Sequence, residues 1–189
     1  MQVLAKGSKV ESGKRFSVVV SGQELRAWAE KIAALTDADI FEIVPAEPYT
    51  AADLNWNDRN SRTSIETDAP SCRPGIDGEP VDLEGYSMIF IGYPIWWASI
   101  PMPIATFLES YDFSGKRIIP FCSHGGGRFG QSLTAIAKLA PDADMGQGLA
   151  VSYSGGASLA DDIKVWLEAN KIYRDRHSAK CKALAWSES

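Results

Sequence analysis

The sequence contains few of the residues that build disulfide scaffolds or metal sites. Among its 189 residues are three cysteines and two histidines, with no Cys-x-x-Cys pair and no histidine-rich stretch. Such scattered cysteines exclude a disulfide-rich fold and argue against a structural zinc site, so we expect no metal. The chain is 45% hydrophobic, which excludes an intrinsically disordered protein. A chain of this length suggests one domain that buries about 70% of the surface of its unfolded state.

Basic residues are also scarcer than acidic ones. The formal net charge is −5, yet residues 1–15 and 171–189 each carry +3, so residues 16–170 carry −11. A nucleic-acid-binding domain would usually carry a basic stripe, so we expect no nucleic-acid partner. We interpret residues 16–170 as one acidic domain, and residues 1–15 and 171–189 as basic terminal extensions.

Signals for export or membrane insertion are weak. The lysines near the N-terminus are not followed by the apolar stretch that a secretory signal needs. Residues 85–108 carry no charge and match the length of a membrane span, but they contain three prolines, each costing a helix interior about 3 kcal/mol. We expect this segment to divide into strand, loop and helix. The predicted location is cytoplasmic, with no membrane partner.

Apolar runs alternate with helical patterns along most of the chain. Strands are predicted over residues 16–20, 39–44, 87–92, 116–122 and 148–153. Helices are predicted after a capping box at Ser21, and over about residues 100–110, 129–139 and 159–167. Five strands alternating with helices indicate an α/β fold with a parallel sheet wound on both faces. Ligands of such folds bind outside the carboxyl ends of the strands.

Residues 45–84 break this alternation. They contain five prolines, many polar residues and no sustained period. Loops of this length inside a compact domain are more often functional than idle. A surface excursion with a helical turn around residues 53–59 is an equally good interpretation.

Two loops follow the most apolar strands. The first, residues 93–97, holds three aromatic residues, and adjacent tryptophans cannot easily both enter the core, so we expect at least one of Trp96 and Trp97 to be exposed. A flat ligand such as a flavin ring would match that surface. The alternative is that both tryptophans pack beneath residues 45–84. The second loop, residues 122–130, is rich in glycine and would let backbone N–H groups approach a ligand or form an ordinary turn.

Cys122 and His124 invite a thiol-catalysis hypothesis, with the histidine as base. The position of Cys122 at the end of a strand favours a buried, inert thiol. No orienting carboxylate is identifiable for His124, and a satisfied loop histidine is the better interpretation. A hydrolytic function through this pair is therefore the weakest hypothesis.

Five stretches together resemble the bacterial flavodoxin family. They are residues 29–33, 38–49, 89–97, 106–116 and 120–127, of which Gly-Tyr-Pro-Ile-Trp-Trp and Phe-Leu-Glu-Ser-Tyr-Asp-Phe-Ser-Gly-Lys are the most specific. The resemblance covers about three quarters of the chain. It implies a five-stranded flavodoxin-like sheet of order 2-1-3-4-5 that binds one FMN, with electron or hydride transfer as the chemistry.

The same resemblance implies where the FMN lies. Two loops would flank the isoalloxazine ring, and a third, after the first strand, would hold the phosphate at a helix N-terminus. The ring site comprises Pro94, Ile95, Trp96, Trp97, Ala98, Ser123, His124, Gly125, Gly126 and Gly127. The candidate phosphate donors are Ser17, Ser21, Gly22 and Gln23.

The first loop departs from the family pattern. Members carry a Thr-Gly-Asn-Thr type of turn, whereas this chain keeps only Ser21 and Gly22. Glu24 would also place a carboxylate at the positive end of the helix dipole, beside the phosphate, although Arg26 would offset part of this. Either the loop has diverged and binds FMN weakly or not at all, or residues 1–25 reflect a frame error. The unfamiliar residues 171–189 invite the same two explanations.

The sequence therefore predicts an FMN-binding flavodoxin-like flavoprotein, acting in electron transfer or as a flavin-dependent oxidoreductase. No side chain stands out as an obligatory acid or base. A basic redox partner protein would suit the acidic domain, and an exposed aromatic edge would suit a homodimer. The rival hypothesis is a flavin-free interaction module with a degenerate phosphate loop.

Overall fold

The computed structural model describes residues 6–7, 16–20, 23–78 and 80–172. Its strands are β1 (Lys6–Gly7), β2 (Phe16–Val20), β3 (Asp39–Glu42), β4 (Val44–Pro45), β5 (Ile76–Asp77), β6 (Met88–Pro94), β7 (Arg117–His124), β8 (Asp144–Met145) and β9 (Leu149–Ser152). Its helices are α1 (Gln23–Thr36), α2 (Arg62–Asp68), α3 (Met102–Ser110), α4 (Ser132–Leu139) and α5 (Leu159–Ala169), with a 3₁₀ turn at Gly156–Ser158.

A parallel sheet forms the centre of the molecule, as predicted. Strands β3, β2, β6, β7 and β9 are neighbours in that order, which is the order that the family resemblance implies. Among the described residues the sheet contains seven strands rather than the predicted five, because β1 adds antiparallel to β3 and β8 pairs with the start of β7. Both extra strands have two residues, too few for a hydrophobic period to show in the sequence.

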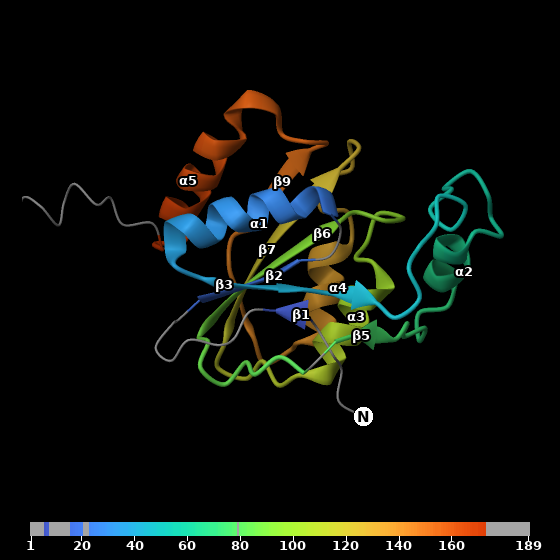
Figure 1. Cartoon of the computed structure of the whole chain (residues 1–189), viewed down its shortest axis with the longest axis horizontal. Helices are drawn as coiled ribbons and strands as arrows, with labels where there is room; N and C mark the ends of the chain where they lie inside the picture. The colour runs from blue at the N-terminus through green and yellow to red at the C-terminus, as the bar shows by residue number, and fades with distance from the viewer. Residues whose placement is uncertain (1–5, 8–15, 21–22, 79, 173–189) are drawn as a thin grey trace, which may run out of the picture.

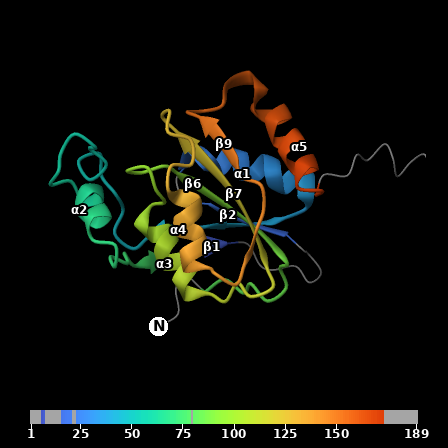
Figure 2. The ribbon, with the colours of Figure 1, turned by 180° about the vertical axis from the view of Figure 1, so that it is seen from behind.

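Helices cover both faces of the sheet, so that the fold has three layers (Figures 1 and 2). On one face, α1 and α5 pack through Trp28, Ile32, Ile163 and Trp166 against Phe90 and Phe121 of the central strands. On the other face, the apolar sides of α3 and α4 meet the opposite side chains of the same strands. This double coverage explains why β6 and β7 read as continuous apolar runs.

Residues 46–75 form the α2 lobe, which projects beyond the sheet (Figure 1), whereas Ile76, Val81 and Leu83 lie back in the core beside the sheet. The predicted helical turn at residues 53–59 is wrong, because these residues form turns and the helix lies at Arg62–Asp68. The Asn55 side chain accepts from the Asn57 N–H group, and that of Asp58 from the Asn60 N–H group. Such local bonds compete with helix formation, which begins only where Ser61 caps α2.

The long uncharged segment at residues 85–108 divides into β6, a loop and the start of α3, as expected. Within the described ranges, no helix is both long enough and apolar enough to span a membrane.

Gly92 lies where β6 presses against β7. A Cβ atom at this position would stand 2.2 Å from the ring of Phe121, which is itself fully buried. The absence of a side chain at Gly92 is therefore what allows the Phe121 ring to fill the core between the sheet and α5.

We predict that Gly92→Ala lowers the free energy of unfolding by about 1–3 kcal/mol, because a packed core does not yield space for an added methyl group. Equilibrium unfolding in urea measures the change. The matched control is Gly85→Ala, where an added Cβ would meet nothing within 4 Å. Equal stability of the two variants would contradict this account of the β6–β7 contact.

Candidate functional site

Two loops leave the carboxyl edge of the sheet side by side. Pro94 at the end of β6 is the register partner of Ser123 in β7. The Ile95 N–H group then donates to the Ser123 carbonyl at 2.9 Å, which continues the pairing into the loop. The predicted aromatic loop and the predicted glycine loop are thus brought together by the sheet itself.

The aromatic loop is a tight turn. Trp96 and Ser99 exchange two backbone hydrogen bonds, of 3.1 and 2.8 Å, while Trp97 and Ala98 between them have positive φ angles of 49° and 59°. Trp96 packs edge-on against Tyr49 at a centroid distance of 5.0 Å. The Trp97 side chain is 42% exposed, which confirms the expectation that at least one indole reaches the surface.

The glycine loop leaves open space above its backbone. A Cβ at Gly126 or Gly127 would meet nothing within 4 Å, and one at Gly125 would meet only Tyr153, at 3.8 Å or more. The Gly126 N–H group donates to Nδ1 of His124 at 3.0 Å, and Gly126 has a φ of 130°. The imidazole therefore shapes this loop, and the glycines leave room for a flat group beside it.

A backbone contact joins the aromatic loop to the start of α4. The Gln131 N–H group donates to the Ala98 carbonyl at 2.6 Å. Gly130, with a φ of 50°, lies so close that a Cβ there would stand 2.3 Å from the same oxygen. Nearby, the buried Tyr93 hydroxyl donates to Oγ of Ser132 at 3.1 Å. These contacts fix the aromatic loop relative to the glycine loop.

Tyr153 lies at the candidate site, although the sequence analysis did not include it. Its N–H group donates to the His124 carbonyl at 3.0 Å, its φ is 47°, and its side chain is 72% exposed next to Gly125. Its place in the sequence could have indicated this position, because Tyr153 directly follows β9 and so lies at the same edge of the sheet.

The candidate phosphate donors are less well placed. The structure does not bring Ser17 to the carboxyl edge, because this residue lies three positions before the end of β2, fully buried. Ser21 and Gly22 lie outside the described residues, and Gln23 is the first residue of α1. The Arg26 guanidinium, expected to offset Glu24, instead contacts the carboxylate of Glu42 at 2.8 Å and that of Glu30 at 3.4 Å.

Thiol catalysis finds no support at Cys122. The side chain is fully buried, and burial raises the pKa of its thiol to about 12. His124, the proposed base, uses Nδ1 to accept the Gly126 N–H bond. Cys122 is therefore a core residue, as its position at the strand end indicated.

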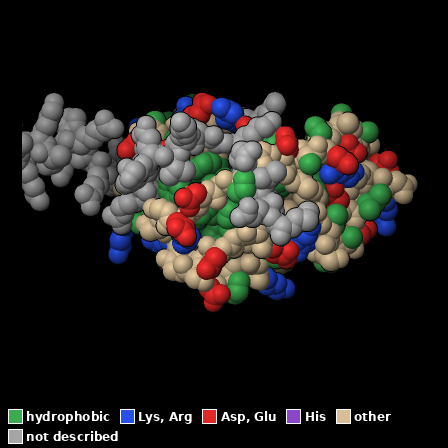
Figure 3. Space-filling model, turned by 60° about the horizontal axis from the view of Figure 1, so that its bottom comes forward, with side chains coloured by type: hydrophobic (Ala, Val, Ile, Leu, Met, Phe, Trp, Pro, Cys, Tyr) green, Lys and Arg blue, Asp and Glu red, His purple; other side chains and the backbone are tan. Residues whose placement is uncertain are grey.

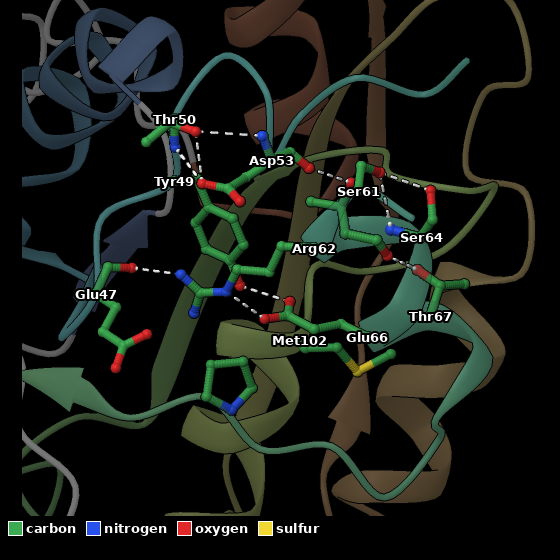
Figure 4. A network of polar contacts seen from close by, with 12 residues as sticks. Glu47, Tyr49, Thr50, Asp53, Ser61, Arg62, Ser64, Glu66, Thr67 and Met102 are labelled. Atoms are coloured by element: carbon green, nitrogen blue, oxygen red, sulfur yellow. Dashed lines mark hydrogen bonds and ion pairs between the residues drawn. The ribbon is translucent and has the colours of Figure 1, made fainter. Parts of the chain in front are cut away.

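A polar network ties α2 to Glu47 and Tyr49 at the start of the same lobe (Figure 4). The Tyr49 hydroxyl donates to Glu66 at 2.6 Å, and the guanidinium of Arg62 contacts Glu66 at 2.7 Å while lying over the Tyr49 ring. Arg62 also donates to the Glu47 carbonyl at 2.8 Å. Burial and the bond to Glu66 raise the pKa of Tyr49 well above its usual range, which keeps the hydroxyl a donor. Since Tyr49 also packs on Trp96, this network positions the loop.

The sequence profile of the Flavodoxin family matches residues 15–170. The chain belongs to the flavodoxin family. The match includes residues 16–25, and β2 pairs in parallel with two strands, which favours a diverged first loop over a frame error in that segment.

Solved structures of flavoproteins are similar to this one. A candidate flavoprotein from Bacteroides eggerthii is 34% identical, with 85% of this chain and 99% of that chain covered and a TM-score of 0.76. One from Bacteroides uniformis is 35% identical, with coverage of 83% and 99% and a TM-score of 0.75. The Lactobacillus acidophilus flavoprotein in complex with FMN is 19% identical, with 82% of this chain and 99% of that chain covered and a TM-score of 0.60. At that identity the comparison shows only that the two proteins share a fold. No curated protein matches the chain.

We predict that Cys122 stays unmodified in the folded protein at pH 8, because almost none of a thiol with a pKa near 12 is ionised there. Iodoacetamide treatment followed by peptide mass spectrometry measures this. Denaturation in urea should expose Cys122 to rapid alkylation. Modification of Cys122 in the folded protein as fast as that of half-buried Cys72 would contradict its assignment to the core.

We further predict that Tyr49→Phe lowers the free energy of unfolding by about 1–2 kcal/mol, since the buried Glu66 carboxylate loses a hydrogen bond. Urea unfolding again measures the change. Tyr153→Phe, which alters an exposed ring, is the control and should be neutral within about 0.5 kcal/mol. A neutral Tyr49→Phe variant would show that the network does not fasten the lobe.

Proposed function

We propose that this flavodoxin-family protein binds FMN at the carboxyl edge of the sheet and acts in electron transfer or as an FMN-dependent oxidoreductase. The observation that carries the proposal is the contact between two loops: the aromatic loop, which exposes the indole of Trp97, and the glycine loop, which has open space above Gly126 and Gly127. A flat ring system needs these two surfaces, one aromatic and one bare of side chains.

The residues present fit the flavin ring. Trp97 would pack against the ring, since offset aromatic stacking contributes about 0.5–1.5 kcal/mol beyond burial. The glycine loop would let the backbone approach the ring edge, and Tyr153 would offer a second exposed aromatic face. The bound FMN would supply the redox chemistry, while the chain supplies orientation and electrostatics. The fold shared with the Lactobacillus acidophilus flavoprotein, whose structure is a complex with FMN, supports this assignment.

The phosphate end of the site offers few donors. Ser21, Gly22 and Gln23 remain the proposed phosphate donors, at the N-terminus of α1, where backbone N–H groups favour an anion. Glu24 adds a negative charge to the same turn, and Arg26 is held by Glu30 and Glu42. We therefore propose that the phosphate adds little affinity and that ring contacts dominate.

The charge of the domain suggests the kind of redox partner. Residues 16–170 carry a net charge of −11, which would attract a basic protein surface and speed its encounter. Such a basic electron-transfer protein is the proposed macromolecular partner. The exposed aromatic edge would also serve a homodimer.

We predict that the full-length protein binds FMN and that Trp97→Ala weakens this binding about tenfold, because the ring loses its aromatic contact. Quenching of flavin fluorescence during titration measures the dissociation constant. Val165→Ala, which shortens an exposed side chain on α5, is the control and should bind FMN like the unaltered protein.

Riboflavin, which lacks the phosphate, provides a second comparison in the same titration. We expect it to bind within about tenfold of FMN, since the first loop contributes little. A colourless protein with no saturable quenching at high micromolar FMN would contradict the flavoprotein assignment. That result would favour the flavin-free interaction module.

A further inference from the structure

A groove of about 530 Å³ lies between β9 and α5, at the side of the molecule away from the α2 lobe (Figure 2). Leu149 and Val151 line it from the strand, and Val165 and Ala169 line it from the helix. The Val165 side chain is 66% exposed, and Ala169 is exposed as well. The groove therefore leaves apolar side chains in water along one side of the sheet.

The strand beside this groove has an open edge. β9 pairs with β7, and it has no second neighbour among the residues that the structure describes. The Tyr153 N–H group donates to the His124 carbonyl of β7. Because the backbone groups of successive strand residues alternate in direction, the N–H groups of Ala150 and Ser152 point away from β7. The Ser152 carbonyl fits this alternation, since it accepts from the Gly155 N–H group rather than from β7.

The open edge lacks the usual protection against further pairing. Edge strands of natural proteins commonly carry lysine, proline or inward-pointing charges, which keep other strands from adding to the sheet. Residues 145–160, which include β9, contain no charged residue and no proline. The edge is therefore suited to accept an extended segment, whose side chains on one face would fill the groove.

The described part of the chain ends beside the same groove. The Asn170 side chain donates to the Gln147 carbonyl and accepts from the Gln147 N–H group, both at 3.0 Å, which joins the end of α5 to the residues before β9. Ile172 packs against the same apolar cluster as Leu149. Residues 173–189, here called the C-terminal segment, follow directly. A tethered segment has a far higher effective concentration at this edge than a separate partner would have.

The C-terminal segment contains a pattern that suits the groove. Its stretch Ala183-Leu184-Ala185-Trp186 alternates small and large apolar residues. In a strand, this period of two places Leu184 and Trp186 on one face and the two alanines on the other. The large side chains would then cover Val165 and the strand residues of the groove.

Charge also favours this segment over a second copy of the domain. The C-terminal segment holds four basic residues against two acidic ones, whereas residues 16–170 carry −11. Figure 3 shows acidic side chains spread over the described surface of that domain. Asp161 and Asp162 lie in the first turn of α5, and Asp162 lines the groove itself. The basic segment is attracted to this edge, and a second acidic domain is repelled.

The topology decides the direction of an added strand. The chain steps from β6 to β7 to β9 over the face that α3 and α4 cover, whereas α5 lies on the opposite face. A further step in the same direction, through α5 to a parallel strand, would make a left-handed crossover, which is rare in proteins. The rule does not apply to an antiparallel strand. Residues 173–182 reach at most about 35 Å when extended, enough to pass the roughly 13 Å of β9 and turn back.

We propose that residues 183–186 add to the sheet as an antiparallel strand beside β9, with Leu184 and Trp186 in the groove. Lys180 and Lys182 then come to the carboxyl edge of the sheet, where the acidic first turn of α5 lies. The C-terminal segment thereby protects the open edge against pairing with other chains. The inference does not depend on flavin binding, because no residue that lines the groove is a proposed FMN contact.

Hydrogen exchange of the ¹⁵N-labelled full-length protein, followed by nuclear magnetic resonance, tests the proposal. The Ala150 and Ser152 amides should be protected in the unaltered protein. Leu184→Asp should speed their exchange about tenfold or more, because burying an unpaired carboxylate in the groove is costly. The matched control is Ser178→Asp, which adds the same charge outside the proposed strand and should change the exchange less than about twofold. The amide of Ile119, which is fully buried in β7, should stay protected in both variants and so show that the fold is intact.

Three results would overturn the proposal. The first is rapid exchange of the Ala150 and Ser152 amides in the unaltered protein, which would leave the edge open to a separate partner. The second is an equal loss of protection in Leu184→Asp and Ser178→Asp. The third is protection that disappears on dilution together with a dimer seen by light scattering, because a second copy would then cover β9.

Discussion

The arrangement of the site depends on one backbone contact, between the Ala98 carbonyl and the start of α4. The Gln131 N–H group donates to this oxygen at 2.6 Å, and Gly130 lies too close for any side chain. This contact holds the aromatic loop in a turn with two residues at positive φ, a conformation that side chains make costly. As a result, Trp97 is exposed to solvent and Trp96 packs against Tyr49. Two loops from different strands therefore act as one surface.

Much of the fold could be predicted because the central strands are buried on both faces. Each such strand appears in the sequence as an apolar run, and helical periods between the runs implied a parallel sheet. The two-residue strands β1 and β8 have no period and escaped prediction. The helix of the lobe was misplaced because Asn55 and Asp58 bond to nearby backbone, which favours turns, while Ser61 supplies the cap further along. Hydrogen bonds between a side chain and the nearby backbone are difficult to predict from the sequence.

The sequence predicted those parts of the candidate site that directly follow a strand. The aromatic and glycine loops were found because they follow β6 and β7, the most apolar strands. Tyr153 follows β9 by the same rule and was overlooked. Trp56 and Trp97 line the same cavities although they are distant in the sequence, so no residue spacing predicts that they lie near each other. Ser17 looked suitable by type, yet its place inside β2 buries it. Side-chain type identifies a candidate donor, but position along the strand decides what it can reach.

The central claim is that the aromatic and glycine loops together bind the flavin ring. Nuclear magnetic resonance of the ¹⁵N-labelled full-length protein during FMN addition tests it most directly. The account predicts saturable shifts of the Trp97 indole N–H signal and of the Gly125, Gly126 and Gly127 amides. Signals from the opposite end of the sheet, such as those of Glu84 and Asp112, should stay unmoved. Saturable shifts confined to residues outside these two loops, or no shifts at all, would contradict the account.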